Sequence, residues 1–437
     1  MQRITLALLS IGLLAGCLSN GGDSGGSGTV ADVPQVLRIT QVDPVRWSGE
    51  PSILALADGT LLITGAGGFT RYVEDPTDIP GNFGQSYVWR STDGGANWTF
   101  VALDLPEPLG MLLPYRNAIV GVEGDLADDE AGHTYFVDLS LFPGVNGLSR
   151  SDDSGATWTA AQTPVVGLPA SDRPWVAAYG DGQVFVKYLT QADGHHVSRS
   201  TDAGVTFPED VAIPPCGQGP LASDRSDASI LVPCVVGSNV FVLRHTGSGP
   251  MVWESIPVAT ADNSGDDFPA VAVAGPGQYV MVWRAASEEG DGTRILVSAS
   301  LDRGATWSEP LQVSAPDRTS VFPWIDANAD GTVAVVWYEA DQAGDPNTMD
   351  AEWRVHLARL DLGATGLSAP AAITVTTDPI HVGSICTAGL NCVIEGRAED
   401  RRLLDFFEVD VDAAGAAHIA WTSTETEVPS VWYGQVK

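Results

Sequence analysis

The sequence contains very little lysine and few cationic groups in total. Among 437 residues, only Lys187 and Lys437 are lysines, and 22 Lys and Arg face 55 Asp and Glu, which gives a formal net charge of −33. Binding to a nucleic-acid backbone depends on cations that displace counterions, so this composition predicts no nucleic-acid partner. A net charge of this size favours a soluble monomer. After the N-terminal leader, no apolar run reaches the roughly 18 residues that a transmembrane helix needs.

Helical periodicity is also missing, whereas residues typical of turns and strands are abundant. The chain holds 48 Gly and 28 Pro in short clusters, 13 Trp, and 44% hydrophobic residues. This much apolar material excludes wholesale disorder. The frequent turn signals between short apolar runs predict an all-β protein.

The first residues have the layout of an export signal. Arg3 precedes an apolar run from Ile4 to Leu14, and small residues follow before Cys17. The string Leu14-Ala15-Gly16-Cys17 resembles a bacterial lipobox. That resemblance implies a lipoprotein signal peptide over residues 1–16, a lipidated Cys17, and a Gly/Ser tether over residues 17–33. The chain would then be extracytoplasmic and anchored by lipid to a membrane, at the cell surface or in the periplasm. An ordinary cleaved signal with an incidental cysteine is the alternative.

Four further cysteines remain, at positions 216, 234, 386 and 392. In an oxidising compartment an even number of cysteines indicates disulfides, and we favour the two sequence-local pairs, Cys216–Cys234 and Cys386–Cys392. A metal site is the alternative, but no histidine lies at ligand spacing from either pair, so no metal is predicted there.

One motif, S-x-D-x-G-x-x-(W/F), occurs four times, beginning at Ser91, Ser151, Ser200 and Ser300. Its Asp can accept amide hydrogen bonds inside a turn, and its Gly can adopt a positive φ. The motif resembles the Asp-box (BNR) repeat of sialidases and other secreted β-propellers. The resemblance implies structural turns away from any pocket, formed by Asp93, Gly95, Trp98, Asp153, Gly155, Trp158, Asp202, Gly204, Phe207, Asp302, Gly304 and Trp307.

A second pattern, an apolar strand, a turn and another apolar strand, begins near residues 51, 117, 174, 220, 269, 323 and 406. This spacing is typical of four-stranded antiparallel propeller blades and predicts seven of them in a single domain over residues 34–437. A six-blade ring is the alternative, because the copy near Pro220 is the least regular. The segment Pro34–Val42 is expected to complete the last blade and close the ring.

Residues at the start of the inner strands are expected to surround the mouth of the central channel, on the face opposite the Asp boxes. The ligand-binding candidates there are Arg46, Trp47, Arg116, Arg173, Trp324 and Arg402. The catalytic candidates are Glu50, Asp172, Asp267 and Asp405. Aromatic walls with a few convergent charges suit a ligand site. A solvated rim whose Arg–Asp pairs only hold loops together is the alternative.

The chemistry of sialidases does not transfer to this chain by motif. In that family an arginine opens the first inner strand, whereas Gly49 stands at that position here, before Glu50-Pro51. None of the nine tyrosines can be assigned as the nucleophile. We therefore expect a sialidase-like propeller that binds a glycan or a protein without catalysis. The alternative is a glycoside hydrolase, an exo-α-sialidase or another Asp-box glycosidase, which needs two carboxyl groups across a cleft.

Two further features were considered as sites. Asp326-x-Asn328-x-Asp330-Gly331 matches the opening of a calcium loop, but a hairpin turn accounts for it better. His195-His196 is expected to face solvent. No cofactor is predicted, and a structural calcium ion on the acidic surface has no assignable residues.

Overall fold

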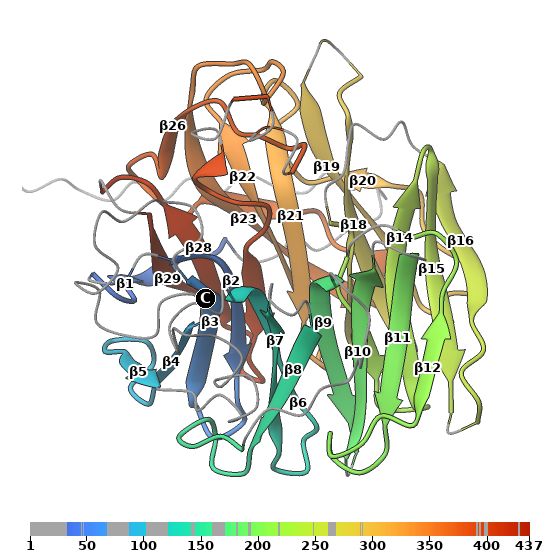
Figure 1. Ribbon diagram of the computed structural model, residues 1–437. Helices are drawn as coiled ribbons and strands as arrows, with labels where there is room; N and C mark the ends of the chain where they lie inside the picture. The colour runs from blue at the N-terminus through green and yellow to red at the C-terminus, as the bar shows by residue number, and fades with distance from the viewer. Residues whose placement is uncertain are drawn as a thin grey trace, which may run out of the picture.

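Seven β-sheets stand side by side around a central axis (Figure 1). The computed structural model describes residues 33–67, 87–101, 121–159, 171–260 and 268–437, with short gaps at 45, 47, 141–144, 181, 191–193, 217–218, 248, 289, 291, 390–391, 393–394, 397–400 and 427–428. The fold is an all-β propeller of antiparallel blades, which confirms the predicted class and the count of seven. The leader, Cys17 and most of the tether lie outside the described residues.

Each blade is a meander that starts at the axis and ends at the rim. The strands, in blade order, are β2–β5 (Ser48–Ala55, Leu61–Gly67, Tyr87–Ser91, Thr99–Val101); β6–β8 (Gly121–Asp128, Thr134–Ser140, Val145–Ser151); β9–β12 (Ser171–Tyr179, Gln183–Thr190, Gly194–Ser200, Glu209–Ala212); β13–β16 (Ala222–Asp224, Ser229–Val236, Asn239–Thr246, Glu254–Thr260); β17–β20 (Ala270–Gly275, Gln278–Ala286, Thr293–Ser300, Leu311–Gln312); β21–β26 (Ser320–Ala327, Thr332–Ala340, Ala351–Gly363, Gly366–Leu367, Ala371–Thr374, His381–Gly383); and β27–β29 (Glu408–Val411, Ala417–Ser423, Ser430–Val436). Within the described part of the chain, blade 2 has three strands.

The N-terminal strand closes the ring, as predicted. β1 (Val36–Gln41) pairs with β29 and becomes the outermost strand of blade 7, with Ile39 opposite Gly434. The backbones of Gln35 and Lys437 exchange two hydrogen bonds at the end of this pairing, 2.7 and 2.9 Å long. Both ends of the described chain therefore hold the same blade together.

The four repeated turns share one hydrogen-bond pattern. In each, the Ser hydroxyl donates to the Asp carboxylate at 2.8–2.9 Å and accepts the Gly amide at 2.8–3.0 Å. The same carboxylate also accepts the backbone amide of the residue four positions after the Asp, which is Asn97, Thr157, Thr206 or Thr306. The four glycines have φ between +77° and +84°, which a side chain would strain.

These turns also lock each blade onto the preceding one. A Cβ on Gly95 would meet the ring of Tyr433 in blade 7, and one on Gly155 would meet Leu62 in blade 1. Gly204 and Gly304 face Leu148 and Ile256 of the preceding blades in the same way. The motif thus serves the packing between blades as well as the local turn.

We expect Gly95→Ala to destabilise the protein more than Gly94→Ala. Both residues have a positive φ, +79° and +68°, so alanine strains the backbone similarly at each position. A Cβ at position 95 would lie 2.1 Å from the Tyr433 ring, whereas one at position 94 would meet nothing within 4 Å. Urea denaturation should show an extra loss of about 1–3 kcal/mol for Gly95→Ala. Equal losses in the two variants would contradict the packing role.

Two disulfides join sequence-local cysteines, Cys216–Cys234 and Cys386–Cys392, as favoured from the sequence. The first ties the segment after β12 to β14, and the second closes a short loop between β26 and β27. Their presence indicates an oxidising, extracytoplasmic environment. Among the described residues, no helix has the length and apolarity to cross a membrane.

Candidate functional site

Three inner strands begin with strained residues at the end of the propeller axis where the channel mouth was predicted. Glu50, Arg173 and Phe322 have φ of +48°, +55° and +53°, and each directly precedes a proline. The register shifts near these residues in β2, β9 and β21, which marks a β-bulge in each strand. Such conformations persist only where surrounding contacts fix them, and they are common at functional sites.

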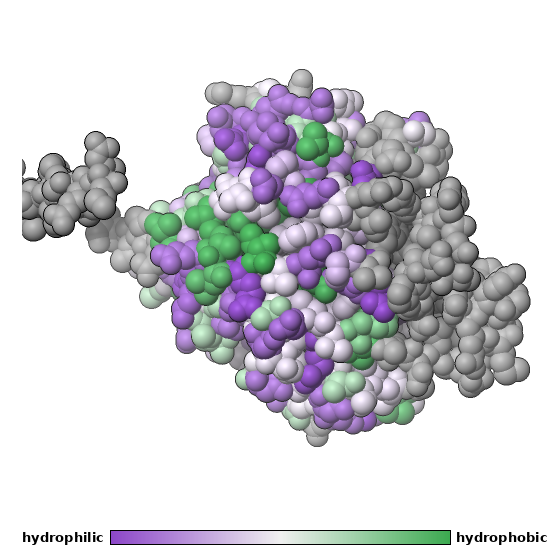
Figure 2. Space-filling model, turned by 90° about the vertical axis from the view of Figure 1, so that its left-hand side faces the viewer, coloured by the Kyte–Doolittle hydropathy of each residue, from purple (hydrophilic) through white to green (hydrophobic). Residues whose placement is uncertain are grey.

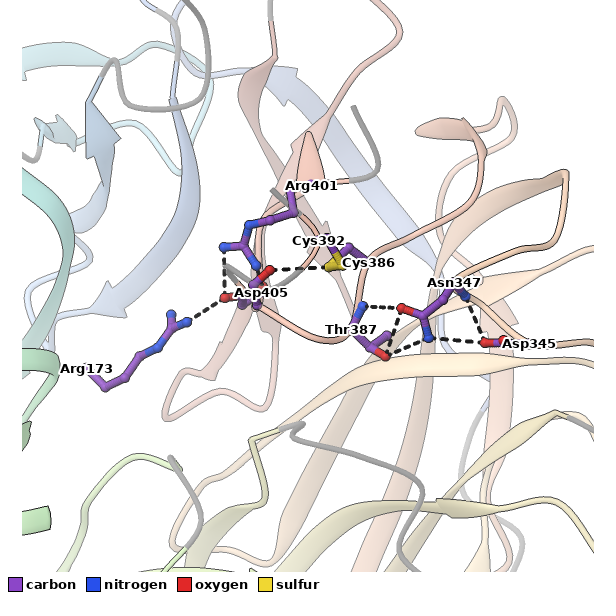
Figure 3. Close-up of a disulfide and its surroundings, with 9 residues drawn as sticks. Arg173, Asp345, Asn347, Cys386, Thr387, Cys392, Arg401 and Asp405 are labelled. Atoms are coloured by element: carbon purple, nitrogen blue, oxygen red, sulfur yellow. Dashed lines mark hydrogen bonds and ion pairs between the residues drawn. A yellow bond between two sulfur atoms is a disulfide. The ribbon is translucent and has the colours of Figure 1, made fainter. Parts of the chain in front are cut away.

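Five charged side chains from four blades form one ion network at this end of the axis, where the channel mouth was predicted. Figure 3 shows three of them, Arg173, Arg401 and Asp405. The Arg173 guanidinium bonds Asp405 at 2.5 Å, Glu123 at 2.8 Å and Glu50 at 3.3 Å. Arg401 binds both oxygens of Asp405, at 2.6 and 3.0 Å. Backbone amides complete the network, because the amide of Arg173 donates to Glu123 and that of Asp405 donates to Glu50. We call these five residues the mouth cluster.

Burial makes the mouth cluster electrostatically unusual. The five side chains are between 4 and 12% exposed. Burial raises the pKa of Glu50 to about 7 and that of Glu123 well above its usual range, with Arg173 opposing both shifts. Burial also acts to raise the pKa of Asp405, but Arg173 and Arg401 outweigh it and hold that pKa below the usual value. Asp405 is therefore the ionised member, while Glu50 and Glu123 hold protons more readily.

Aromatic rings from four blades meet beside the mouth cluster. The Trp175 ring lies 4.9 Å from Phe406, 5.4 Å from Trp324 and 6.1 Å from Phe268, between ring centroids. All four residues are at most 6% exposed. The Arg173 guanidinium also lies 4.9 Å from the centre of the Phe268 ring. We call these four residues the aromatic plug, because rings from blades 3, 5, 6 and 7 can meet only across the axis.

Further along the inner strands, carboxylates connect adjacent blades. Asp125 in blade 2 accepts the amide of Val176 in blade 3 at 2.8 Å. Glu408 and Asp410 in blade 7 accept the amides of Ile53 and Ala55 in blade 1, and Asp326 in blade 6 accepts that of Val411 in blade 7. Inner strands have no neighbouring strand on the axis side, so these side chains satisfy amides that would otherwise lack partners. Burial raises the pKa of all four carboxyl groups, that of Asp125 and of Asp326 to about 6.

These shifts predict that stability falls as the pH rises from about 5 to 7. Carboxyl groups with raised pKa bind more protons in the folded chain than in the unfolded one, so raising the pH through this window favours unfolding. Seven groups act this way: Glu50, Glu123, Asp125, Asp326, Glu408, Asp410 and the more exposed Glu425. His195, His356 and, near pH 7, Lys187, whose pKa values burial lowers, act in the opposite direction. We expect a net loss on the order of 3 kcal/mol in urea denaturation at constant ionic strength.

Asp125→Asn provides the matched control for this pH dependence. The variant removes one titrating carboxyl group, so its stability should change less between pH 5 and 7 than that of the unmodified chain. Stability that stays constant or rises over this interval would contradict the assignment of the raised pKa values.

The structure brings together only some of the predicted candidates. Glu50, Arg173 and Asp405 belong to the mouth cluster, and Asp172 adjoins it, half-exposed, with its carboxylate accepting the Arg173 amide at 3.0 Å. Trp324 belongs to the aromatic plug. The candidates Trp47, Arg116 and Asp267 lie outside the described residues.

Of the two remaining arginine candidates, Arg46 lies apart from the mouth cluster and Arg402 directly follows its Arg401 in the chain. Arg46 bonds Asp43 at 2.7 Å, and its guanidinium lies 3.9 Å from the ring of Phe100 in the outer strand of blade 1. Arg402 is partly exposed beside Arg401. None of these contacts tests a ligand-binding role, so both residues remain ligand-binding predictions.

Sequence reasoning missed Glu123 and Arg401. Glu123 stands in β6 two residues before the inter-blade carboxylate Asp125, as Phe406 in blade 7 stands two residues before Glu408. This alignment places Glu123 opposite an aromatic residue, so it gives no signal for a charged side chain at that position. Arg401 has no signal either, because it lies in the connection that precedes β27.

The position where sialidases have their first arginine has no room for one here. A Cβ on Gly49 would lie 2.8 Å from the Leu404 side chain and 3.3 Å from the Thr422 hydroxyl. The two arginines of the mouth cluster both bind Asp405, so a carboxylate of the protein itself occupies them. Among the described residues, this arrangement does not resemble a site open to an anionic sugar.

Two features considered from the sequence are structural. His195 and His196 were expected to lie in a loop and face solvent, and this prediction was wrong. β11 already begins at Gly194, so both histidines lie within the strand, buried at 9 and 7% exposure. His196 lies 3.0 Å from the Asp210 carboxylate. In the Asp326–Gly331 segment, Asn328 caps a turn by accepting the amides of Asp330 and Thr332 at 3.1 Å. No group of three or more metal-ligating side chains is found in the described part of the chain.

The fold defines the class of this protein: it is a seven-blade all-β propeller. Comparison of the chain with known proteins finds only distant similarities. No family model matches the chain. A xyloglucanase from Paenibacillus sp. is 27% identical in a match 212 residues long, which covers 43% of this chain and 20% of the xyloglucanase. The chain thus spans about a fifth of the length of that curated relative.

Solved structures with similar folds share little sequence with the chain. A protein of unknown function from Dyadobacter fermentans is 13% identical, with a TM-score of 0.48 and coverage of 93% of this chain and 99% of its own. An α-L-arabinofuranosidase from Fusarium graminearum is also 13% identical (TM-score 0.47, coverage 90% and 95%). The same identity is found for an intramolecular trans-sialidase from Ruminococcus gnavus (TM-score 0.43, coverage 94% and 96%).

Proposed function

We propose that this chain is an exported, lipid-anchored propeller that binds a neutral glycan on the mouth face without cleaving it. One observation carries the non-catalytic part. Each carboxylate of the mouth cluster is held by arginine or by a backbone amide, and Asp405 binds two arginines at once. Such saturated groups stabilise a scaffold and are poorly placed to move protons during hydrolysis.

The choice of a neutral glycan has two supports. A chain with a net charge of −33 repels anionic sugars unless free cations converge on them. The partial match to a xyloglucanase, whose name refers to a neutral polysaccharide, favours the same ligand class.

The test combines binding and turnover on the same samples. Affinity electrophoresis with xyloglucan, arabinan and a sialylated glycan should show retardation by a neutral polysaccharide, and reducing-end assays should show no release of sugar. Arg402→Ala should weaken retardation, whereas Arg303→Ala, in a repeated turn on the opposite face, should not. Absence of retardation by all three glycans would refute the proposal.

A glycoside hydrolase is the second candidate, and the opposite pKa shifts favour it. Glu50, with its raised pKa, could act as the acid, while Asp405 stays ionised. Two carboxyl groups with opposite shifts are the usual arrangement for this chemistry. If xyloglucan or a fluorogenic sialoside is turned over, and Glu50→Gln abolishes turnover while the variant still binds, the hydrolase replaces the binding-only function.

The lipid anchor is tested separately. We expect mass spectrometry of the chain from bacterial membranes to find diacylglycerol thioether on Cys17 as the first residue. An unmodified Cys17 within a longer peptide would refute this part of the proposal.

A further inference from the structure

Exposed apolar side chains gather at one place on the described surface. Nine large hydrophobic residues are exposed on the described surface as a whole. Four of them fall within residues 33–39: Val33, Val36, Leu37 and Ile39, at 72, 38, 54 and 40% exposure. The other five are dispersed over blades 3–6. Figure 2, which faces the side of the molecule that carries β1, shows a continuous green area there. A clustered patch of this kind marks an interaction site, whereas single exposed residues do not.

The patch lies on the outermost strand of blade 7. Ile39 pairs with Gly434 and Gln41 pairs with Trp432, so Ile39 and the half-buried Trp432 share one face of the sheet. The outer edge of β1 has no partner strand in the described structure. The apolar side chains are therefore presented at the rim of the propeller, far from the mouth cluster.

The charge of this rim is opposite to that of the whole chain. Neither β1 nor β29 contains an acidic residue, although 55 of 437 residues in the chain are acidic. The charged residues within and directly flanking these two strands are Arg38 and Lys437, while Asp32 precedes Val33 at the start of the patch. Basic residues beside exposed apolar side chains fit the headgroups and the acyl boundary of an anionic bilayer.

We propose that the outer edge of blade 7 rests on an anionic phospholipid bilayer. This inference rests on the proposed lipid anchor: Cys17 precedes Val33 by 16 residues, which reach at most about 55 Å and typically 20–25 Å. A tether of that reach raises the local concentration of bilayer, so even a small patch stays engaged. The propeller then stands on its rim, and its mouth opens parallel to the membrane surface.

A second copy of the chain is a less suitable occupant. Two copies joined through β1 by a two-fold axis would place Arg38 and Lys437 of each near those of the other. The same basic groups attract anionic headgroups.

The experiment places a polarity-sensitive fluorophore on Ile39→Cys in the anchored chain, with Val382→Cys, 61% exposed in blade 6, as the matched control. The probe is a vesicle of neutral phospholipid with about one-third anionic phospholipid. We expect vesicles to shift the emission at position 39 to the blue and to reduce its quenching by aqueous iodide at least about threefold, with no change at position 382. Adding Arg38→Glu should reduce the protection.

The outcomes separate this inference from the proposed anchor. Vesicle flotation and the mass of Cys17 decide the anchor, and the fluorophore decides the surface; if Cys17 carries no lipid, the same label at excess vesicle still reports contact. Equal quenching at positions 39 and 382 would overturn the inference. Protection without vesicles that increases with protein concentration would also overturn it, because a second copy would then cover the patch.

Discussion

Arg173→Met should lower the free energy of unfolding by about 3–5 kcal/mol at pH 7. The substitution keeps most of the apolar stem but removes the guanidinium that bonds Asp405, Glu123 and Glu50, each at most 6% exposed. Three carboxyl groups would then share the single remaining cation, Arg401, in a buried environment. Urea denaturation with a fluorescence readout measures the loss.

Two comparisons make this prediction specific. Arg303→Ala, which removes a half-exposed guanidinium 3.0 Å from Asp227, should lose less than about 1 kcal/mol. Because the unpaired carboxyl groups of Arg173→Met can accept protons, the difference between this variant and the unmodified chain should shrink as the pH falls from 7 toward 5. A deficit independent of pH would mean that packing, and not charge, explains the loss.

Trp175→Ala should be comparably destabilising, by about 3–5 kcal/mol. Its ring is 1% exposed and contacts three other rings of the aromatic plug, so alanine leaves a cavity where blades 3, 5, 6 and 7 meet. Thermal unfolding followed by circular dichroism measures the change. Trp175→Phe should recover more than half of it, since a ring remains. A Trp175→Ala variant as stable as the unmodified chain would show that the plug contributes little.

The repeated elements of the fold could be predicted from the sequence because their determinants are local. The four Ser–Asp–Gly turns form hydrogen bonds over two to four residues, and the apolar runs recur at blade spacing. The closure of the ring could also be predicted from the sequence. The apolar strand at Pro34–Val42 lacks a local partner and the last blade lacks a fourth strand, so pairing the two leaves fewer open strand edges.

The mouth cluster could be predicted only in part, because its contacts join distant segments. Arg173 bonds Asp405, 232 positions away in the chain, and Glu50, 123 positions away. The sequence places Glu50, Arg173 and Asp405 near one face, but it does not show that they bind one another. From the sequence, Arg46 is expected on the same face as these three residues. In the structure, contacts with Asp43 and with the Phe100 ring hold its side chain at the outer strand of blade 1 instead.

The pairing of β1 with β29 has a consequence for biogenesis. Residues 36–41 are synthesised nearly 400 residues before their hydrogen-bonding partners, residues 430–436. Blade 7 therefore cannot assemble until Ser430–Val436 have been made. Until then the leading strand stays without its native partner, so chaperones have a defined window in which to protect it.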